Sequence, residues 1–271
     1  MKFTVKLQKG KKMIKPILKY PGAKWRIADW IVDKLPMHET YLEPYFGSGA
    51  IFFNKPPAKI ETINDIDKDV INLFKVMREH TEELVNLVNL TPYARDEYYM
   101  SYEKTSNSLE DARRFLVRCW QAYGTKTATR TGWRNNLSDN SSNNVKQWNS
   151  VSERIMKVIH RLKNVQIENA DALELIQKYN TKNCLIYADP PYITETRTRY
   201  IYANEIDLTH HERLLELLLN HSGSVVISGY EHPLYNSYLK NWDKYTKLTM
   251  AEKGKKRMEV IWLKLDMKNL F

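Results

Sequence analysis

The chain has 271 residues, of which 42% are hydrophobic, and a formal net charge of +10. That supplies enough apolar side chains for a sizeable core and argues against a disordered protein. The basic N-terminal segment lacks the apolar stretch of a signal peptide, and no run is long enough to cross a membrane. Cys119 and Cys184 are far apart and form no metal or disulfide pattern. We expect a soluble cytoplasmic protein with an anionic partner, most simply nucleic acid; the alternative is an ordinary basic enzyme surface.

The first third of the chain predicts an α/β unit. Residues 24–35 have apolar side chains at helical spacing, and Pro36 ends that helix. A short strand at 41–42 leads into a glycine turn and the start of a helix. A second strand over 59–67 ends in acidic residues, and a long helix is expected over 69–90. The order strand, helix, strand indicates a parallel sheet.

The middle of the chain differs in composition. A helix is expected over 109–123, whereas residues 124–150 are polar, aperiodic and almost free of aliphatic side chains. Loops of this length inside a folded chain are usually functional or disordered. Residues 113–164 hold eleven Lys and Arg and two acidic residues, and eleven minus two gives a net charge of +9. The helix that resumes at Ser152 is expected to turn three residues inward: Ile155, Ile159 and Leu162.

The α/β pattern returns towards the C-terminus. A helix near residue 208 is expected to begin with a capping box formed by Thr209 and Glu212. The apolar runs predict strands near 165–168, at 184–188, at 224–229 and at 256–265, with a further helix before residue 179. The insertion in the middle is therefore the candidate for a second domain.

The glycine turn, residues 43–49, follows a strand and precedes a predicted helix. Gly47 and Gly49 allow backbone N–H groups to come close to a ligand, although such a turn can also be purely structural. Asp65 ends the next strand, where Rossmann-like domains place the acid that binds ribose hydroxyls. The third glycine of a dinucleotide fingerprint is missing. This combination favours an adenosyl ligand without phosphates.

The sequence Asp189-Pro190-Pro191-Tyr192 follows an apolar strand. Two consecutive prolines fix two φ angles and restrain Asp189 towards an extended conformation. The Asp189 carboxylate and the Pro190 carbonyl offer two acceptors at the carboxyl end of a strand, which suits the two N–H groups of an exocyclic amine. Tyr192 is placed to stack on a flat base. A rigid structural turn is the alternative.

These motifs resemble those of Dam-type DNA adenine-N6 methyltransferases of the alpha group. The resemblance rests on Tyr20-Pro21-Gly22-Ala23-Lys24, the glycine turn, Asn64-Asp65, Asp171 and Asp189-Pro190-Pro191-Tyr192. It implies a Rossmann-like class I methyltransferase fold, with a mixed seven-stranded sheet and a mainly helical target-recognition insertion. The catalytic domain would comprise residues 12–74 and 165–271, and the insertion residues 75–164.

The resemblance also implies the roles of individual residues. Asp65 would bind the ribose hydroxyls and Asp171 the adenine amine of S-adenosyl-L-methionine, with Lys24 at its methionine end. The complete set of expected cofactor residues is Tyr20, Pro21, Gly22, Ala23, Lys24, Glu43, Pro44, Phe46, Gly47, Ser48, Gly49, Asp65 and Asp171. The target adenine would be flipped out of the duplex onto Asp189, Pro190, Pro191 and Tyr192. The reaction needs no metal, and His210 and His211 are expected to be helix-start residues without a catalytic part.

The insertion is expected to bind double-stranded DNA. Its Dam relatives that act on GATC carry an Asn-Gly-x-x-Arg-Tyr type of segment, which residues 124–150 lack, so GATC is not assumed as the target. Trp133 and Trp148 are expected to be loop anchors, with duplex-opening wedges as the alternative. The expected DNA-binding residues are Arg113, Arg114, Lys126, Arg130, Trp133, Arg134 and Lys146.

Other functions fit parts of the pattern. Methylation of adenine in RNA or of cytosine N4 in DNA would use the same fold, although cytosine enzymes more often carry Ser where Asp189 stands. Glutamine-modifying relatives favour Asn there and would not need a basic insertion. A DNA-binding regulator without turnover is the alternative from another class. We expect a monomer of bacterial or phage origin, with a cognate restriction endonuclease as a further candidate partner.

Overall fold

The computed structural model describes most of the chain, namely residues 14–124, 129–137, 143–193, 195, 202, 204–250 and 256–265. Lys126, one of the expected DNA-binding residues, lies outside these ranges.

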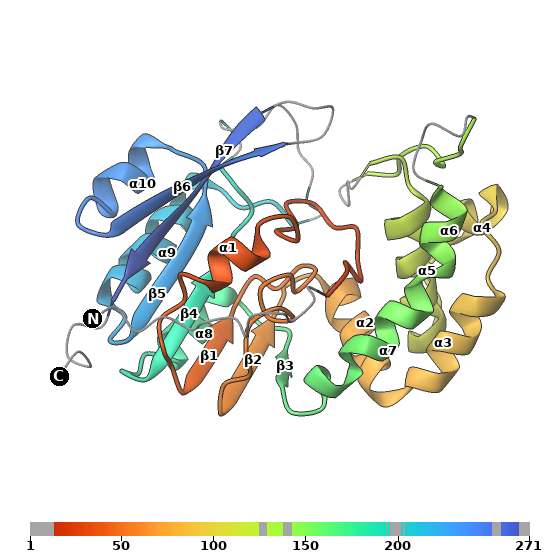
Figure 1. Cartoon of the computed structure of the whole chain (residues 1–271), viewed down its shortest axis with the longest axis horizontal. Coiled ribbons are helices and arrows are strands. Elements are labelled where there is room, and N and C mark those ends of the chain that lie inside the picture. The colour runs from red at the N-terminus through yellow and green to blue at the C-terminus, as the bar shows by residue number, and fades with distance from the viewer. Residues whose placement is uncertain are drawn as a thin grey trace.

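A seven-stranded sheet forms the centre of the larger part of the molecule (Figure 1). The strands lie in the order β3-β2-β1-β4-β5-β7-β6, and the first five of these are parallel. β7 runs antiparallel to both β5 and β6. The expected Rossmann-like mixed sheet is thus confirmed. Its strands are β1 (Thr40–Glu43), β2 (Ile60–Asn64), β3 (Gln166–Glu168), β4 (Cys184–Ala188), β5 (Ser224–Gly229), β6 (Asp243–Met250) and β7 (Lys256–Lys264).

The strand order changes direction between β1 and β4: β2 and β3 lie on one side of β1, and β4, β5, β7 and β6 lie on the other. Thr40 of β1 lies opposite Ile60 of β2 on one side and Cys184 of β4 on the other. Because β1 and β4 are parallel neighbours, their carboxyl ends meet at the same edge, where open α/β sheets bind ligands. The glycine turn follows β1 and Asp189 follows β4. The topology therefore brings together two motifs that are far apart in the sequence.

Side chains alternate between the two faces of the sheet, as the period of a strand requires. On β4, Leu185 and Tyr187 belong to one hydrophobic cluster, and Ile186 and Ala188 belong to the other. The first face packs against α1 (Ala28–Val32). The second face packs against three helices, α8 (Ala172–Lys178), α9 (Leu208–Asn220) and α10 (Pro233–Tyr238).

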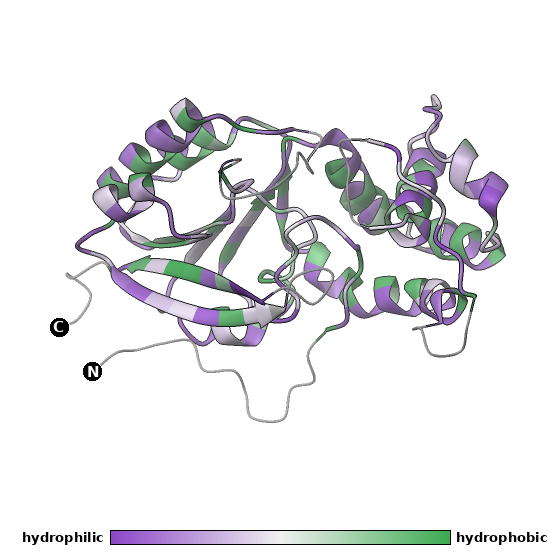
Figure 2. Cartoon of the chain, turned by 90° about the horizontal axis from the view of Figure 1, so that it is seen from above, coloured by the Kyte–Doolittle hydropathy of each residue, from purple (hydrophilic) through white to green (hydrophobic). Residues whose placement is uncertain are grey.

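The remaining helices form a cluster at the right of Figure 1. Their ribbons carry both green and purple in Figure 2, which fits amphipathic helices that pack on one another. α2 contacts α5, α7 and β3, so it bridges the boundary predicted at residues 74 and 75. No helix of the described residues is long and apolar enough to cross a membrane. The helices are α2 (Lys68–Glu79), α3 (Thr81–Leu90), α4 (Arg95–Met100), α5 (Ser108–Gln121), α6 (Asn144–Asn149) and α7 (Val151–Leu162).

Several predicted helix limits are wrong. The helix expected over 24–35 shortens to α1, and the helix expected over 69–90 breaks at His80 into α2 and α3. The chain after Gly49 forms turns instead of the expected helix. On α7, Ile155 and Leu162 are buried as expected, but Val158 is buried in place of Ile159, which is only partly buried.

The capping box expected at Thr209 and Glu212 is also wrong. α9 begins after Asp207, whose carboxylate accepts a hydrogen bond from the His210 N–H at 2.8 Å. Aspartate is among the best N-cap residues, since its side chain satisfies a free N–H of the first turn.

The two tryptophans of the predicted loop anchor it. Trp148 lies on α6, is 2% exposed, and donates to the Thr91 carbonyl at 2.8 Å. Trp133 donates to Gln121 Oε1 at 3.1 Å and packs against the ring of Tyr93. The expectation of loop anchors is confirmed, and burial excludes Trp148 as a wedge into DNA.

A buried ion network ties the insertion to the sheet. Lys55, which is 0% exposed, donates to Glu61 of β2 at 2.6 Å. Arg161 of α7 donates to the same carboxylate at 3.0 Å, and its guanidinium lies 4.2 Å from the centroid of the Phe52 ring. Two cations from different parts of the molecule thus depend on one carboxylate.

We expect Glu61→Ala to destabilise the protein strongly, by about 3–5 kcal/mol, because it leaves Lys55 buried without a counter-charge. Urea unfolding followed by circular dichroism measures this loss. Glu39→Ala is the matched control, because Glu39 forms its ion pair with Lys59 on the exposed surface and its removal should change stability little. Equal effects of the two substitutions would contradict a bracing role for Glu61.

Candidate active site

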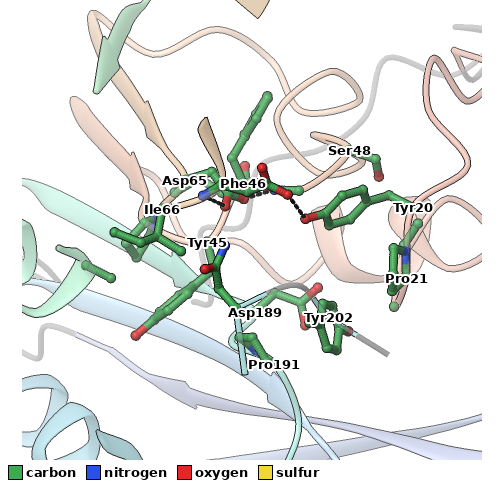
Figure 3. Close-up of a pocket in the computed structure, with 18 of the residues that line it drawn as sticks. Tyr20, Pro21, Tyr45, Phe46, Ser48, Asp65, Ile66, Asp189, Pro191 and Tyr202 are labelled. Carbon is green, nitrogen blue, oxygen red and sulfur yellow. Dashed lines mark hydrogen bonds between the residues drawn. The ribbon is translucent and has the colours of Figure 1, made fainter. Parts of the chain in front are cut away.

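A cavity of about 460 Å³ opens where β1, β2 and β4 end (Figure 3). This volume is typical of small-molecule sites. Gly49, Pro190 and Tyr192 lie outside its lining. The other expected cofactor and catalytic residues line it, namely Tyr20, Pro21, Gly22, Ala23, Lys24, Glu43, Pro44, Phe46, Gly47, Ser48, Asp65, Asp171, Asp189 and Pro191.

The glycine turn has a backbone conformation that favours glycine. Gly47 and Gly49 have φ angles of 50° and 67°. A Cβ on Gly49 would lie 2.4 Å from the Phe46 ring, so the aromatic side chains beneath the turn also exclude a larger residue. The Gly47 N–H donates to Asp65 Oδ2 at 2.7 Å. This N–H therefore fixes the turn to the end of β2. It is not free for a ligand, contrary to the expectation from the sequence that backbone N–H groups of the turn would approach one.

Asp65 lies just after β2, in the wall of the cavity (Figure 3). Burial raises the pKa of Asp65 to about 7, although hydrogen bonds from the backbone N–H groups of Asp67 and Gly47 oppose the shift. Its Oδ1 accepts from Asp67 and its Oδ2 from Gly47. Each carboxylate oxygen has a second lone pair. Asp65 can therefore hold the turn and still accept a hydrogen bond from a ligand hydroxyl.

The lining of the cavity also contains Asp171 and two residues that the sequence analysis did not assign to the site. Asp171 caps α8 by accepting the Leu173 N–H at 2.7 Å. Tyr45 and His210 also line the cavity, with 2.8 Å between the Tyr45 hydroxyl and His210 Nε2. Burial lowers the pKa of His210, and the Asp171 carboxylate opposes this. His210 is thus a cavity residue as well as a helix-start residue, which only the tertiary fold reveals.

Asp189 forms an ion pair with Lys24 at 2.9 Å between Oδ2 and Nζ. Lys24 is buried and also donates to the Gly22 carbonyl at 2.7 Å. Burial raises the pKa of Asp189, while the ammonium group of Lys24 opposes that rise. Asp189 Oδ1 is buried and has no hydrogen-bond partner among the described residues. One carboxylate oxygen is therefore fixed by protein, and the other is an unused acceptor.

Tyr192 is held by three neighbours. Its hydroxyl donates to Glu259 Oε2 of β7 at 2.8 Å. Lys24 Nζ lies 4.6 Å from the centroid of its ring, and the Tyr230 ring approaches it edge-on at 4.5 Å between centroids. The hydroxyl bond to Glu259 fixes the orientation of the ring next to Asp189. The sequence alone gave no signal for Glu259.

Much of the positive charge in the insertion is paired within the protein. The carboxylates that pair with it mostly lie outside residues 113–164, so the count of +9 overstates the free charge there. Arg113 and Arg114 brace the insertion through Glu110, and we therefore leave them out of the DNA-binding surface. Arg130, Arg134 and Lys146 make no ion pair within the described part of the chain. The pairs are Arg113 with Glu97 and Glu110, Arg114 with Glu110, Arg118 with Asp69, Lys157 with Glu153 and Arg161 with Glu61.

Known proteins match this chain over most of its length. The Type II methyltransferase M1.LlaDCHI of Lactococcus lactis subsp. cremoris is 26% identical over 224 residues, which are 73% of this chain and 74% of that protein. The DNA adenine methylase of Haemophilus influenzae is 26% identical, with 75% of this chain and 73% of that protein covered. The DNA adenine methylase of Salmonella typhi is 23% identical, with 87% and 86% covered. The sequence model of the D12 class matches residues 20–260, from the start of the cavity wall to β7. The chain therefore belongs to the D12 class of N6 adenine-specific DNA methyltransferases.

Proposed function

We propose that the enzyme methylates the N6 amine of an adenine that is flipped out of double-stranded DNA at a specific sequence. The observation that carries this proposal is the unpaired Oδ1 of Asp189 at the cavity. A buried acceptor without a donor costs free energy, and an exocyclic amine would supply the missing N–H. Lys24 already occupies Oδ2, so it does not compete for the same oxygen.

The cavity fits S-adenosyl-L-methionine in its donors and acceptors. Asp65 would accept the ribose hydroxyls, and Asp171 the adenine amine, beside Tyr45 and His210. When bound, the cofactor supplies an electrophilic methyl group on a sulfonium. The glycine turn and Phe46 would support the adenosyl group from below.

Asp189 and the Pro190 carbonyl would orient the target amine. Hydrogen bonds to both N–H groups favour a tetrahedral nitrogen with a localised lone pair, and orientation of this kind supplies much of the rate. The carboxylate also stabilises the positive charge that develops on the nitrogen. The Lys24 ammonium group favours the ionised form of Asp189 and opposes the rise in its pKa that burial causes. Tyr192, fixed by Glu259, would stack on the base.

The insertion would hold the duplex. Arg130, Arg134 and Lys146 are the described cations that we assign to phosphates, since none has an ion-pair partner in the described chain. We propose a monomer as the active form. A partnership with a restriction endonuclease of the same specificity is supported by the name Type II methyltransferase of the Lactococcus relative.

The test of the proposed function uses labelled S-adenosyl-L-methionine and unmethylated duplex DNA, followed by nucleoside digestion and mass spectrometry. We expect label in N6-methyladenine, with the modified sites giving the target sequence. Asp189→Ala should lower the rate at least about 100-fold, because it removes an acceptor that acts in the transition state. Asp33→Ala changes an exposed aspartate outside the cavity and should leave the rate unchanged.

Three outcomes would contradict the proposal. Label in N4-methylcytosine would overturn the base assignment, and label found only in RNA would overturn the substrate. DNA binding without any methyl transfer would indicate a regulator. Calorimetry measures whether Asp189→Ala still binds the cofactor. If it does, the variant is folded and its lower rate reflects lost catalysis.

Lys24→Met should shift the acid limb of the pH–rate profile to higher pH. The Lys24 ammonium lowers the pKa of Asp189, so its removal raises that pKa and the reactive carboxylate forms only at higher pH. Single-turnover rates measured across the pH range test this. Lys24→Arg keeps the positive charge and should leave the limb closer to that of the wild type. An unmoved acid limb in Lys24→Met would mean that the ion pair does not control Asp189.

A further inference from the structure

Two cations lie over the ring of Trp120, where the insertion meets the catalytic domain. Lys19 Nζ lies 4.6 Å from the centroid of the Trp120 ring, and the guanidinium carbon of Arg154 lies at the same distance. Burial, assisted by the nearby charges of Arg134 and Arg154, lowers the pKa of Lys19 to about 8. Lys19 comes from the segment before the cavity wall, Arg154 from α7, and Arg134 from the chain between α5 and α6.

No carboxylate forms an ion pair with these three side chains in the part of the chain that the structure describes. Arg154 donates to neutral oxygens, Ser150 Oγ at 3.1 Å and the Pro16 carbonyl at 2.8 Å. Its neighbour Glu153 pairs with Lys157 instead. Lys19 Nζ is shielded from solvent and has no acceptor among the described residues. A buried ammonium group without an acceptor opposes folding, so a binding role is a physical reason to keep Lys19 unpaired in the free protein.

The cluster is held in place next to the cavity. Trp120 Nε1 donates to the Ile17 carbonyl at 2.8 Å, and Arg154 holds the Pro16 carbonyl. The backbone N–H of Arg134 donates to the Gln121 carbonyl at 2.8 Å, which ties its segment to the end of α5. Tyr20, which directly follows Lys19, lines the cavity. An anion bound by the cluster would therefore lie beside the entrance used by a flipped nucleotide.

We propose that Lys19 and Arg154 form a binding site for one phosphodiester group of the DNA substrate. This inference rests on the proposed function, because it takes the partner to be DNA. The two free oxygens of a phosphodiester accept hydrogen bonds from an ammonium and from a guanidinium group at the same time. A phosphate contact carries no information about the base sequence, but it fixes the position of the DNA strand. At this site it would hold the DNA strand where the insertion and the cavity meet.

The experiment measures duplex affinity by fluorescence anisotropy at several salt concentrations, with the full chain and its cofactor analogue S-adenosyl-L-homocysteine. We expect the slope of log affinity against log salt to become shallower by about 1 in Lys19→Met and in Arg154→Met, since each loses a phosphate contact. Lys178→Met is the matched control. Lys178 is exposed at the end of α8, just before the chain enters the amino end of β4. The cavity opens at the carboxyl ends of the strands, so Lys178 lies away from it. Its slope should equal that of the wild type.

Thermal unfolding of the free protein separates a binding role from a structural one. Lys19→Met should raise the melting temperature, because it removes a buried charge without a partner, while it weakens DNA binding. Lys19→Arg should keep the salt slope. A lower melting temperature of Lys19→Met with an unchanged salt slope would overturn the phosphate site.

Methylation of the same duplex by the wild type is measured in parallel. Its absence would refute the proposed function, whereas methylation together with wild-type slopes in both variants would refute only the phosphate site.

Discussion

The buried ion pair between Lys24 and Asp189 is the contact on which the site depends. It joins the turn before α1 to the end of β4, two segments that meet only because β1 and β4 are neighbours in the sheet. Taking two charges out of water is costly unless both find partners. Lys24 has two, Asp189 Oδ2 and the Gly22 carbonyl, whereas Asp189 Oδ1 has none among the described residues. The same pair thus stabilises the carboxylate and leaves one oxygen for the substrate.

The insertion is attached to this centre by polar contacts that do not depend on DNA. Arg161 reaches the Glu61 carboxylate of β2, and Trp120 reaches the Ile17 carbonyl. Arg161 is one of the side chains that a charge count would assign to nucleic acid. The basic insertion therefore has two populations of cations. One is paired and holds the helices together. The other forms no ion pair in the described chain, and we propose that it binds phosphates.

The sequence predicted the sheet and the two motifs well, because both depend on local signals. An apolar strand that ends in Asp189 and two prolines has few structural interpretations, and parallel strands place such ends at one edge. β6 was missed because Asp243, Lys244 and Lys247 interrupt any apolar alternation on this edge strand. The cap of α9 was misplaced by two residues because Asp207 and Thr209 both suit an N-cap, and only geometry decides between them. Partners from distant segments, such as Glu259 for Tyr192, have no sequence signal at all.

Two of the buried polar groups that lack partners are complementary to one strand of DNA. Asp189 Oδ1 is an acceptor on a residue that lines the cavity, and Lys19 Nζ is a donor on the residue that directly precedes Tyr20, which also lines it. A nucleotide offers the opposite groups, an amine on its base and acceptor oxygens on its phosphate. Folding alone would select against both unpaired groups, since each costs free energy in the free protein. We therefore propose that a single bound strand satisfies both groups, with its base within the cavity and its backbone against Trp120 and the cations over its ring.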